Sequence, residues 1–127
     1  MERKSSPEST SRSSLKLLSI ITLISAFSQV ALGGYVRSSE SGLGCPDWPL
    51  CHGQLIPPME FHTLIEYSHR LNASLLMVFV VALFVFCWFR YRDGKSVVIL
   101  SGSAVGLVLS AAILGGITVL TELAWWV

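Results

Sequence analysis

Three ionisable residues, His62, Glu66 and His69, recur at helical spacing just before a long apolar stretch. With Ala73 they are separated by steps of four, three and four, so a helix would place them on one face. Ionisable side chains at membrane depth are costly and usually face the interior of a helical bundle. There a neutral imidazole is a good axial ligand for haem iron, and a carboxylate one turn away is suited to proton transfer. His69 is therefore a candidate haem ligand and Glu66 a candidate catalytic residue.

Each of these side chains also has an ordinary structural interpretation. A lone histidine near a membrane interface is more often a hydrogen-bonded surface residue than a ligand. His62 is interpreted as such an interfacial residue. Glu66 can equally be solvated, or paired with Arg37 or Arg70. These two arginines flank apolar stretches, where they either snorkel to the interface or bind carboxylates such as haem propionates. Arg37 and Arg70 are thus candidate cofactor-binding residues, and helical periodicity does not choose between the alternatives.

A third group consists of Cys45 and Cys51, in a segment at 38–61 rich in proline and glycine. Four prolines and three glycines at 41–58 exclude a helix or an ordinary strand. Oxidising compartments commonly join such a pair in a disulfide, as a structural staple or as a labile redox pair. A zinc site using both cysteines and His52 is a further alternative, although no second ligand pair follows.

Three charge-free windows would position these residues: 17–36, 71–89 and 96–121, of 20, 19 and 26 residues. About 20 apolar residues in a helix cross a bilayer core, and backbone groups in lipid must be satisfied within the segment. Only 13% of the 127 residues are charged, against about 25% in soluble domains. The sequence therefore predicts an all-α, polytopic membrane bundle with helices at about 17–36, 62–89 and 96–121. The alternative for the first window, a cleaved signal peptide, is disfavoured by its length.

Charge bias predicts the orientation of these helices. Basic residues precede the first window and fill the link at 90–95, whereas the connection at 37–70 holds two arginines against four acidic residues. The positive-inside rule then places the N-terminus in the cytoplasm and the loop outside. Residues 1–16 are expected to form a disordered cytoplasmic tail, and 17–127 one membrane domain. A net charge of +1 gives no basic field that would point to nucleic acid.

Small residues mark two of the expected helices. The pairs Gly33-Gly34 and Gly115-Gly116 are each followed six residues later by a glutamate, Glu40 or Glu122. Small residues let helices pack closely in lipid, so packing and a duplicated hairpin explain this repetition about equally well. Cys87 is expected to be a buried apolar residue.

Five segments of the sequence form a recognisable set: GGYVR at 33–37, SGLGCPDWPLCHG at 41–53, PP at 57–58, IEYSHR at 65–70 and LGGITVLT at 114–121. Together they resemble the haem A synthase family, which serves cytochrome oxidase assembly. The similarity runs from about residue 28 to 121. The loop motif joined at this distance to a Glu-x-x-His helix is highly specific.

The resemblance implies a fold, an activity and residue roles. Full-length members have eight transmembrane helices in two four-helix halves, and each half supplies two histidines to haem iron. The enzyme oxidises a ring methyl of haem O to the formyl group of haem A. His69 would be an axial ligand of haem b iron, and Glu66 the carboxylate needed for the chemistry. Cys45 and Cys51 match a loop pair that forms a disulfide in some members.

The resemblance also implies a fourth helix with a second histidine after Thr121, and the sequence does not contain one. We therefore expect three helices of a four-helix half, in a truncated chain that is inactive alone. Expected partners are haem O, membrane lipid, haem O synthase, other oxidase assembly proteins, and a missing C-terminal part or a second copy. The expected location is the cell inner membrane, or the mitochondrial inner membrane in a eukaryote. Two alternative functions are a non-catalytic haem-binding assembly subunit and a membrane thiol-disulfide oxidoreductase.

Overall fold

The computed structural model describes residues 7–122, which form three α-helices and no β-strand. The helices are α1 (Pro7–Ser38), α2 (Phe61–Arg90) and α3 (Lys95–Leu120). Each contains a segment long and apolar enough to cross a membrane, at Ser11–Ser38, Phe61–Arg90 and Lys95–Leu120. The prediction of an all-α, polytopic membrane bundle is confirmed.

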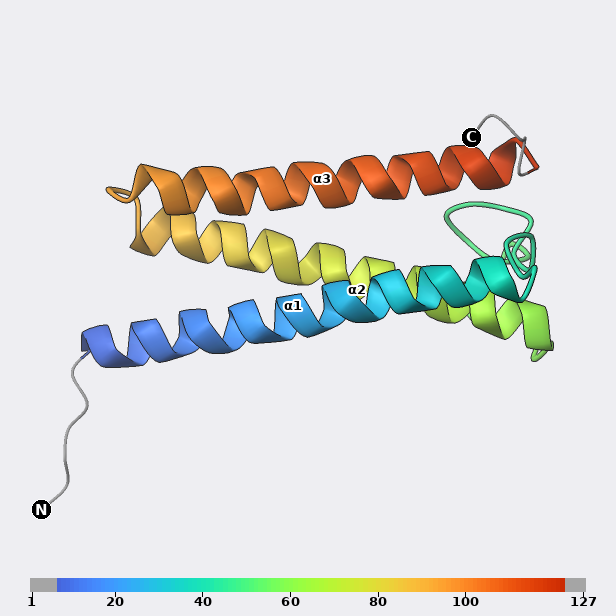
Figure 1. Ribbon diagram of the computed structural model, residues 1–127, viewed down its shortest axis with the longest axis horizontal. Coiled ribbons are helices and arrows are strands. Elements are labelled where there is room, and N and C mark those ends of the chain that lie inside the picture. Colours follow the sequence, from blue (N-terminus) through green and yellow to red (C-terminus); the bar gives the residue numbers. More distant parts are fainter. Residues whose placement is uncertain (1–6, 123–127) are drawn as a thin grey trace, which may run out of the picture.

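α2 is the central helix of the three, and α1 crosses it toward the end that carries the loop (Figure 1). α2 packs against both α1 and α3, whereas α1 and α3 do not contact one another (Figure 1). The loop at 39–60 lies where α1 ends, α2 begins and α3 ends, and we call this the loop end of the bundle (Figure 1). Most large apolar side chains that lie outside the contacts of α2 with α1 and α3 are exposed, as expected for helices that face lipid or further protein.

Proline and glycine residues set the limits of α2 and α3. α2 follows Pro57 and Pro58, and its N-cap Glu60 has an extended backbone. The link after α2 turns at Gly94, whose N–H donates to the carbonyl of Tyr91 at 2.9 Å. Both helices therefore begin and end within one residue of the predicted limits, 62–89 and 96–121.

The beginning of α1 differs from the sequence expectation. We expect a disordered tail at 1–16 and a helix at 17–36, but α1 begins at Pro7 and continues to Ser38. A proline suits the first position of a helix, and residues 8–16 contain no glycine or further proline that would interrupt one. The tail prediction is corrected for residues 7–16, while residues 1–6 lie outside the described part of the chain.

The loop is fastened to the first turn of α2. Thr63 Oγ1 donates to the carbonyl of Gly44 at 3.0 Å, and the buried hydroxyl of Ser41 lies 2.9 Å from Nδ1 of His62. A Cβ at Gly44 would stand 2.3 Å from the carbonyl oxygen of His62, too close for any side chain. Glycine at position 44 therefore allows the loop to approach α2 closely enough to form these bonds.

Candidate functional site

His69 lies on the face of α2 that packs against α1, and its side chain is half-buried. The amide nitrogen of Gln29, on α1, is 3.1 Å from Nδ1 and 3.3 Å from Nε2 of the imidazole. A Cβ at Gly33 would stand 3.1 Å from Cε1 of the same ring. On α1, Gly33 therefore leaves space for the imidazole, and Gln29 contacts its nitrogens.

The polar contact continues one turn further from the loop end. Asn72 Nδ2 donates to Oε1 of Gln29 at 2.7 Å and to the backbone carbonyl of Ser25 at 3.1 Å. Polar side chains within a membrane span are usually turned toward neighbouring helices, where they find hydrogen-bond partners. Gln29 and Asn72 thus tie α1 to α2 directly beside His69.

Glu66 lies one turn before His69 and is 5% exposed. Its Oε1 accepts a hydrogen bond from Nε of Arg70 at 2.8 Å, in a charge-assisted pair four residues apart on α2. Of the three environments open to Glu66 from the sequence, the structure selects the pair with Arg70. A buried carboxylate requires such a partner, because an unpaired charge at this depth is costly.

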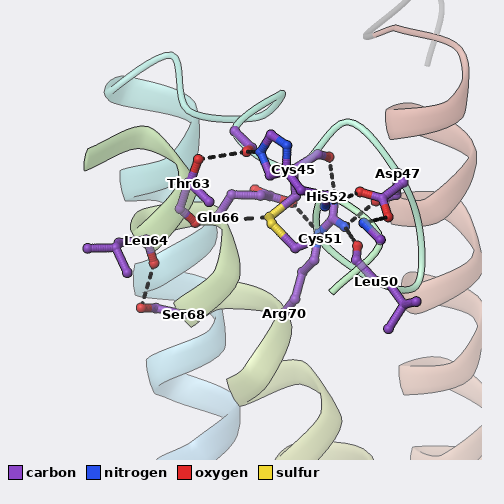
Figure 2. Close-up of a disulfide and its surroundings, with 12 residues drawn as sticks. Cys45, Asp47, Leu50, Cys51, His52, Thr63, Leu64, Glu66, Ser68 and Arg70 are labelled. Carbon is purple, nitrogen blue, oxygen red and sulfur yellow. Dashed lines mark hydrogen bonds and ion pairs between the residues drawn. A yellow bond between two sulfur atoms is a disulfide. The ribbon is translucent and has the colours of Figure 1, made fainter. Parts of the chain in front are cut away.

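Three further donors of Arg70 bind carbonyl groups of the loop. Nη1 donates to the carbonyls of Asp47 and Leu50, the latter at 2.7 Å, and Nη2 donates to the carbonyl of Cys45 at 2.8 Å. Figure 2 shows the Arg70 side chain extending from α2 to the loop beside the cysteines. The arginine therefore links Glu66 to the loop.

Cys45 and Cys51 form a disulfide, and both are buried, at 0% and 2% exposure (Figure 2). The zinc alternative loses its sulfur ligands because both sulfurs are in this bond. No group of three or more metal-ligating side chains occurs anywhere in 7–122. His52 instead directs Nε2 toward the carbonyl of Gly44 at 3.0 Å. The remaining cysteine of the described chain, Cys87, is buried on α2 as expected.

A carboxylate braces the turn that closes this disulfide loop. Oδ1 and Oδ2 of Asp47 accept the backbone N–H groups of His52 and Gly53 at 2.5 Å and 2.8 Å. Both of these residues have a left-handed backbone, with φ of 54° and 68°. The N–H of Gly53 holds the pKa of the Asp47 carboxyl below its usual value, and the N–H of His52 and the charge of Arg70 act in the same direction. Asp47 therefore remains anionic near neutral pH and keeps the turn closed.

Substituting Gly44 is expected to loosen the loop. In Gly44→Ala the new Cβ meets a backbone oxygen, which cannot move without displacing either the loop or the first turn of α2. We expect the Cys45–Cys51 disulfide to be reduced by a phosphine at least several-fold faster than in the unmodified protein, as followed by thiol alkylation.

Gly53→Ala is the matched control for this test. Its Cβ would meet nothing within 4 Å, so it carries only the left-handed strain of about 1–2 kcal/mol. Equal reduction rates in the two variants would show that the contact at Gly44 does not hold the loop in place.

The structure brings together some of the predicted site residues and separates others. Glu66, Arg70 and the two cysteines form one connected group, and His69 lies on the next turn of α2. Arg37 is exposed at the end of α1, and its side chain makes no hydrogen bond or ion pair with the described residues.

Sequence reasoning missed Gln29 and Asn72. A signal for both was present, because each is a large polar residue inside a charge-free window. Gln29 is four residues from both Ser25 and Gly33, which places all three on one helical face. Asn72 extends the spacing of Glu66 and His69 by three residues.

Comparison with known proteins places the chain in a family. A family model described as cytochrome oxidase assembly protein matches residues 16–63. Haem A synthase of Bacillus pumilus is 38% identical over 110 residues, covering 83% of this chain and 35% of the relative. Haem A synthase of Staphylococcus saprophyticus is 39% identical over 115 residues, covering 88% of this chain and 38% of the relative. The chain belongs to the haem A synthase family. It spans a little over a third of the length of these haem A synthases.

The surroundings of His69 fit a haem-binding residue of a haem A synthase. The imidazole is half-buried inside a membrane span, and a glycine of α1 faces its ring. Both of its nitrogens lie against a neutral amide, which suits the neutral imidazole that haem iron requires. A histidine ligand normally donates the N–H of its other nitrogen to an acceptor. The atom of Gln29 that faces the ring is its amide nitrogen, a donor, and Oε1 of Gln29 accepts a hydrogen bond from Asn72.

Substituting the glycine that faces His69 is expected to weaken haem binding. Gly33→Ala would press on Cε1 of the imidazole, and overpacking of this kind typically costs about 1–3 kcal/mol. We expect roughly fivefold or more loss of bound haem per protein at limiting haem, from the absorbance of the purified protein. Gly34→Ala, with nothing within 4 Å of its new Cβ, should retain the haem. Equal loss in both variants would contradict a specific contact at Gly33.

Proposed function

We propose that this chain forms the N-terminal part of a haem A synthase. The enzyme would be an oxidoreductase that converts a ring methyl of haem O to the formyl group of haem A during cytochrome c oxidase cofactor biosynthesis. The observation that carries the proposal is the pair of Glu66 and His69. A buried, ion-paired carboxylate stands one turn from a half-buried imidazole, in a chain related to haem A synthases over most of its length.

Two side chains would hold a haem b in this part of the enzyme. His69 would ligate the iron through a ring nitrogen. Arg37 is exposed, with its guanidinium available for a propionate, whereas Arg70, the other expected propionate ligand, is engaged by the loop. A bound haem would supply electron transfer, while haem O is the substrate.

Glu66 would move the proton in this reaction. Oxidation of a ring methyl removes electrons and protons together, so a base must stand near the substrate. The bond to Arg70 uses Oε1 of the carboxylate, which leaves Oε2 to accept a proton. Burial keeps competing water away from the carboxylate.

The proposed setting is the cell inner membrane, or the mitochondrial inner membrane if the source is a eukaryote. The N-terminus and the link at 90–95 would be cytoplasmic, and the loop end would lie outside. The basic residues of the link support this orientation, and so does the Cys45–Cys51 disulfide, because disulfides persist in oxidising compartments. Proposed partners are haem O, lipid, haem O synthase and other assembly proteins, with the rest of the enzyme or a second copy.

Haem conversion tests the proposed function directly. The full-length protein, as its gene encodes it, would be produced in cells that make haem O but lack their own haem A synthase. Extraction of the haems and chromatography should then show haem A, with cells carrying the empty vector as the control. Haem retained by the protein without any haem A would instead favour the non-catalytic haem-binding subunit.

The structure gives less support to a thiol-disulfide oxidoreductase. Such an enzyme needs an accessible sulfur, but both sulfurs of the Cys45–Cys51 bond are buried. Cys87, the free thiol of the described chain, is buried on α2 near its other end and does not offer a second redox pair.

A further inference from the structure

One guanidinium joins the proposed catalytic carboxylate to the disulfide loop. Arg70 donates from Nε to Glu66, from Nη1 to the carbonyls of Asp47 and Leu50, and from Nη2 to the carbonyl of Cys45. These three carbonyls all belong to the ring that the Cys45–Cys51 bond closes. Glu66 and the ring are therefore hydrogen-bonded to the same planar guanidinium.

The geometry of arginine makes this connection directional. The guanidinium is planar and presents five donors in a fixed fork, of which four are used here. When Nη1 and Nη2 are held by the ring, Nε can point in only one direction, which is the direction of the carboxylate. The side chain is 13% exposed, so it is not free to turn toward a propionate without giving up these bonds.

The ring that holds the guanidinium is itself fixed to the protein. The disulfide closes it covalently, and Asp47 braces its turn through the N–H groups of His52 and Gly53. The carbonyl of Gly44, next to the ring, accepts a hydrogen bond from the hydroxyl of Thr63 at the start of α2. The position of the guanidinium is therefore set from the loop side, independently of Glu66.

We propose that Arg70 is a positioning residue, which fixes the Glu66 carboxylate for reaction by anchoring it to the disulfide-closed ring, and that it does not bind haem. This inference rests on the proposed function of Glu66. It also gives the Cys45–Cys51 bond a role in catalysis that involves no electron transfer. The closed ring orients Arg70, and Arg70 in turn orients the carboxylate of Glu66.

The distribution of effects between kcat and KM tests this proposal. In the full-length protein, Arg70→Gln should lower kcat for haem A formation by roughly ten- to a hundredfold, since small misplacement of a catalytic group has effects of this size. The KM for haem O and the bound haem should remain within about twofold, because no substrate contact is lost. Arg90→Gln, at the other end of α2, is the matched control and should leave both constants unchanged.

A second pair of variants tests the connection to the ring. Cys45→Ser/Cys51→Ser should lower kcat in the same direction as Arg70→Gln, and the combined variant should be little worse than the stronger of the two. Residues that act through one another give such non-additive effects. Fully multiplicative losses would overturn the coupling between ring and carboxylate. A raised KM or loss of haem in Arg70→Gln, with kcat preserved, would overturn the positioning role and restore propionate binding.

If the glutamine variant does not accumulate in membranes, Arg70→Lys tests whether Arg70 positions Glu66 or binds haem. Lysine keeps the charge beside Glu66 but cannot reproduce the fork, so kcat should fall with KM unchanged. A raised KM with unchanged kcat would again overturn the proposal. Full activity in Glu66→Gln would instead refute the proposed role of Glu66 itself, and this outcome is distinct from each of those above.

Discussion

Replacing His69 by alanine should abolish the low-spin haem spectrum of the protein. The imidazole is the proposed axial ligand, and the nearest side chain of α1, Gln29, offers an amide that cannot replace it as an iron ligand. We expect at least a tenfold fall in haem bound through this site per protein, since loss of residues that only support a ligand already costs roughly ten- to a hundredfold. The measurement is the reduced-minus-oxidised difference spectrum of the purified full-length protein, normalised to protein content.

His62→Ala is the matched control for the loss of His69. The two histidines share a face of α2, but His62 is exposed and hydrogen-bonded to Ser41 in the loop. The control variant should therefore keep its haem. A haem spectrum unchanged by His69→Ala would remove His69 as a ligand.

Much of the fold follows from local sequence patterns. The length of the charge-free windows predicts three helices, because a membrane span must satisfy its own backbone. Proline and glycine at the loop and at the link set the ends of α2 and α3. The same reasoning failed at the beginning of α1, because charge and serine content mark the end of the apolar segment and not the end of the helix. Residues 7–16 continue α1 beyond the apolar window.

The repeated glycine pairs show a feature that the sequence pattern does not predict, namely which glycine of each pair contacts another segment. In each pair one member meets a side chain: a Cβ at Gly33 would touch His69, and one at Gly116 would stand 3.0 Å from the ring of Trp48. Their neighbours Gly34 and Gly115 have nothing within 4 Å. Only the rotation of the helices against their partners decides which member makes the contact.

The glutamates that follow these pairs have a common structural role. Glu40 and Glu122 both have φ of 53°, and each lies just beyond the end of a helix. Their N–H groups donate to the carbonyls of Arg37 and Val119, which belong to the last turn of α1 and α3. The repetition seen in the sequence therefore corresponds to two helices that end in the same way.

The environment of the candidate site was the least predictable part. The spacing of Glu66 and His69 places them on one face, but the sequence left Glu66 with three possible environments. The choice depends on the loop, because the loop carbonyls hold Arg70 from the far side and turn Nε toward Glu66. Contacts between residues 20 or more positions apart carry this information, and no local pattern contains it.

Replacing Glu66 by glutamine should stop haem A formation while leaving the site assembled. Glutamine has nearly the same shape as glutamate, and its carbonyl oxygen can still accept the bond from Nε of Arg70. It cannot accept a proton from the substrate, and loss of a positioned base typically costs about a hundred- to ten-thousandfold in rate. We therefore expect the haem O supplied to the full-length protein to remain unconverted, with the haem bound at His69 unchanged in the difference spectrum.

The design of this experiment separates catalysis from stability. Glu66→Ala would leave the buried guanidinium of Arg70 without its counter-charge and without the bond from Nε, and breaking a buried pair in this way typically destabilises a protein by about 3–5 kcal/mol. Glutamine keeps the hydrogen bond from Nε of Arg70 and so disturbs the pair less than alanine does. An unchanged haem spectrum then separates a fall in activity from a loss of structure. Glu60→Gln is the matched control, because Glu60 is exposed at the N-cap of α2 and its side chain makes no capping bond. Haem A formation at the normal rate in Glu66→Gln would show that the base lies elsewhere, and the Arg70 contact would then serve only to hold the loop against α2.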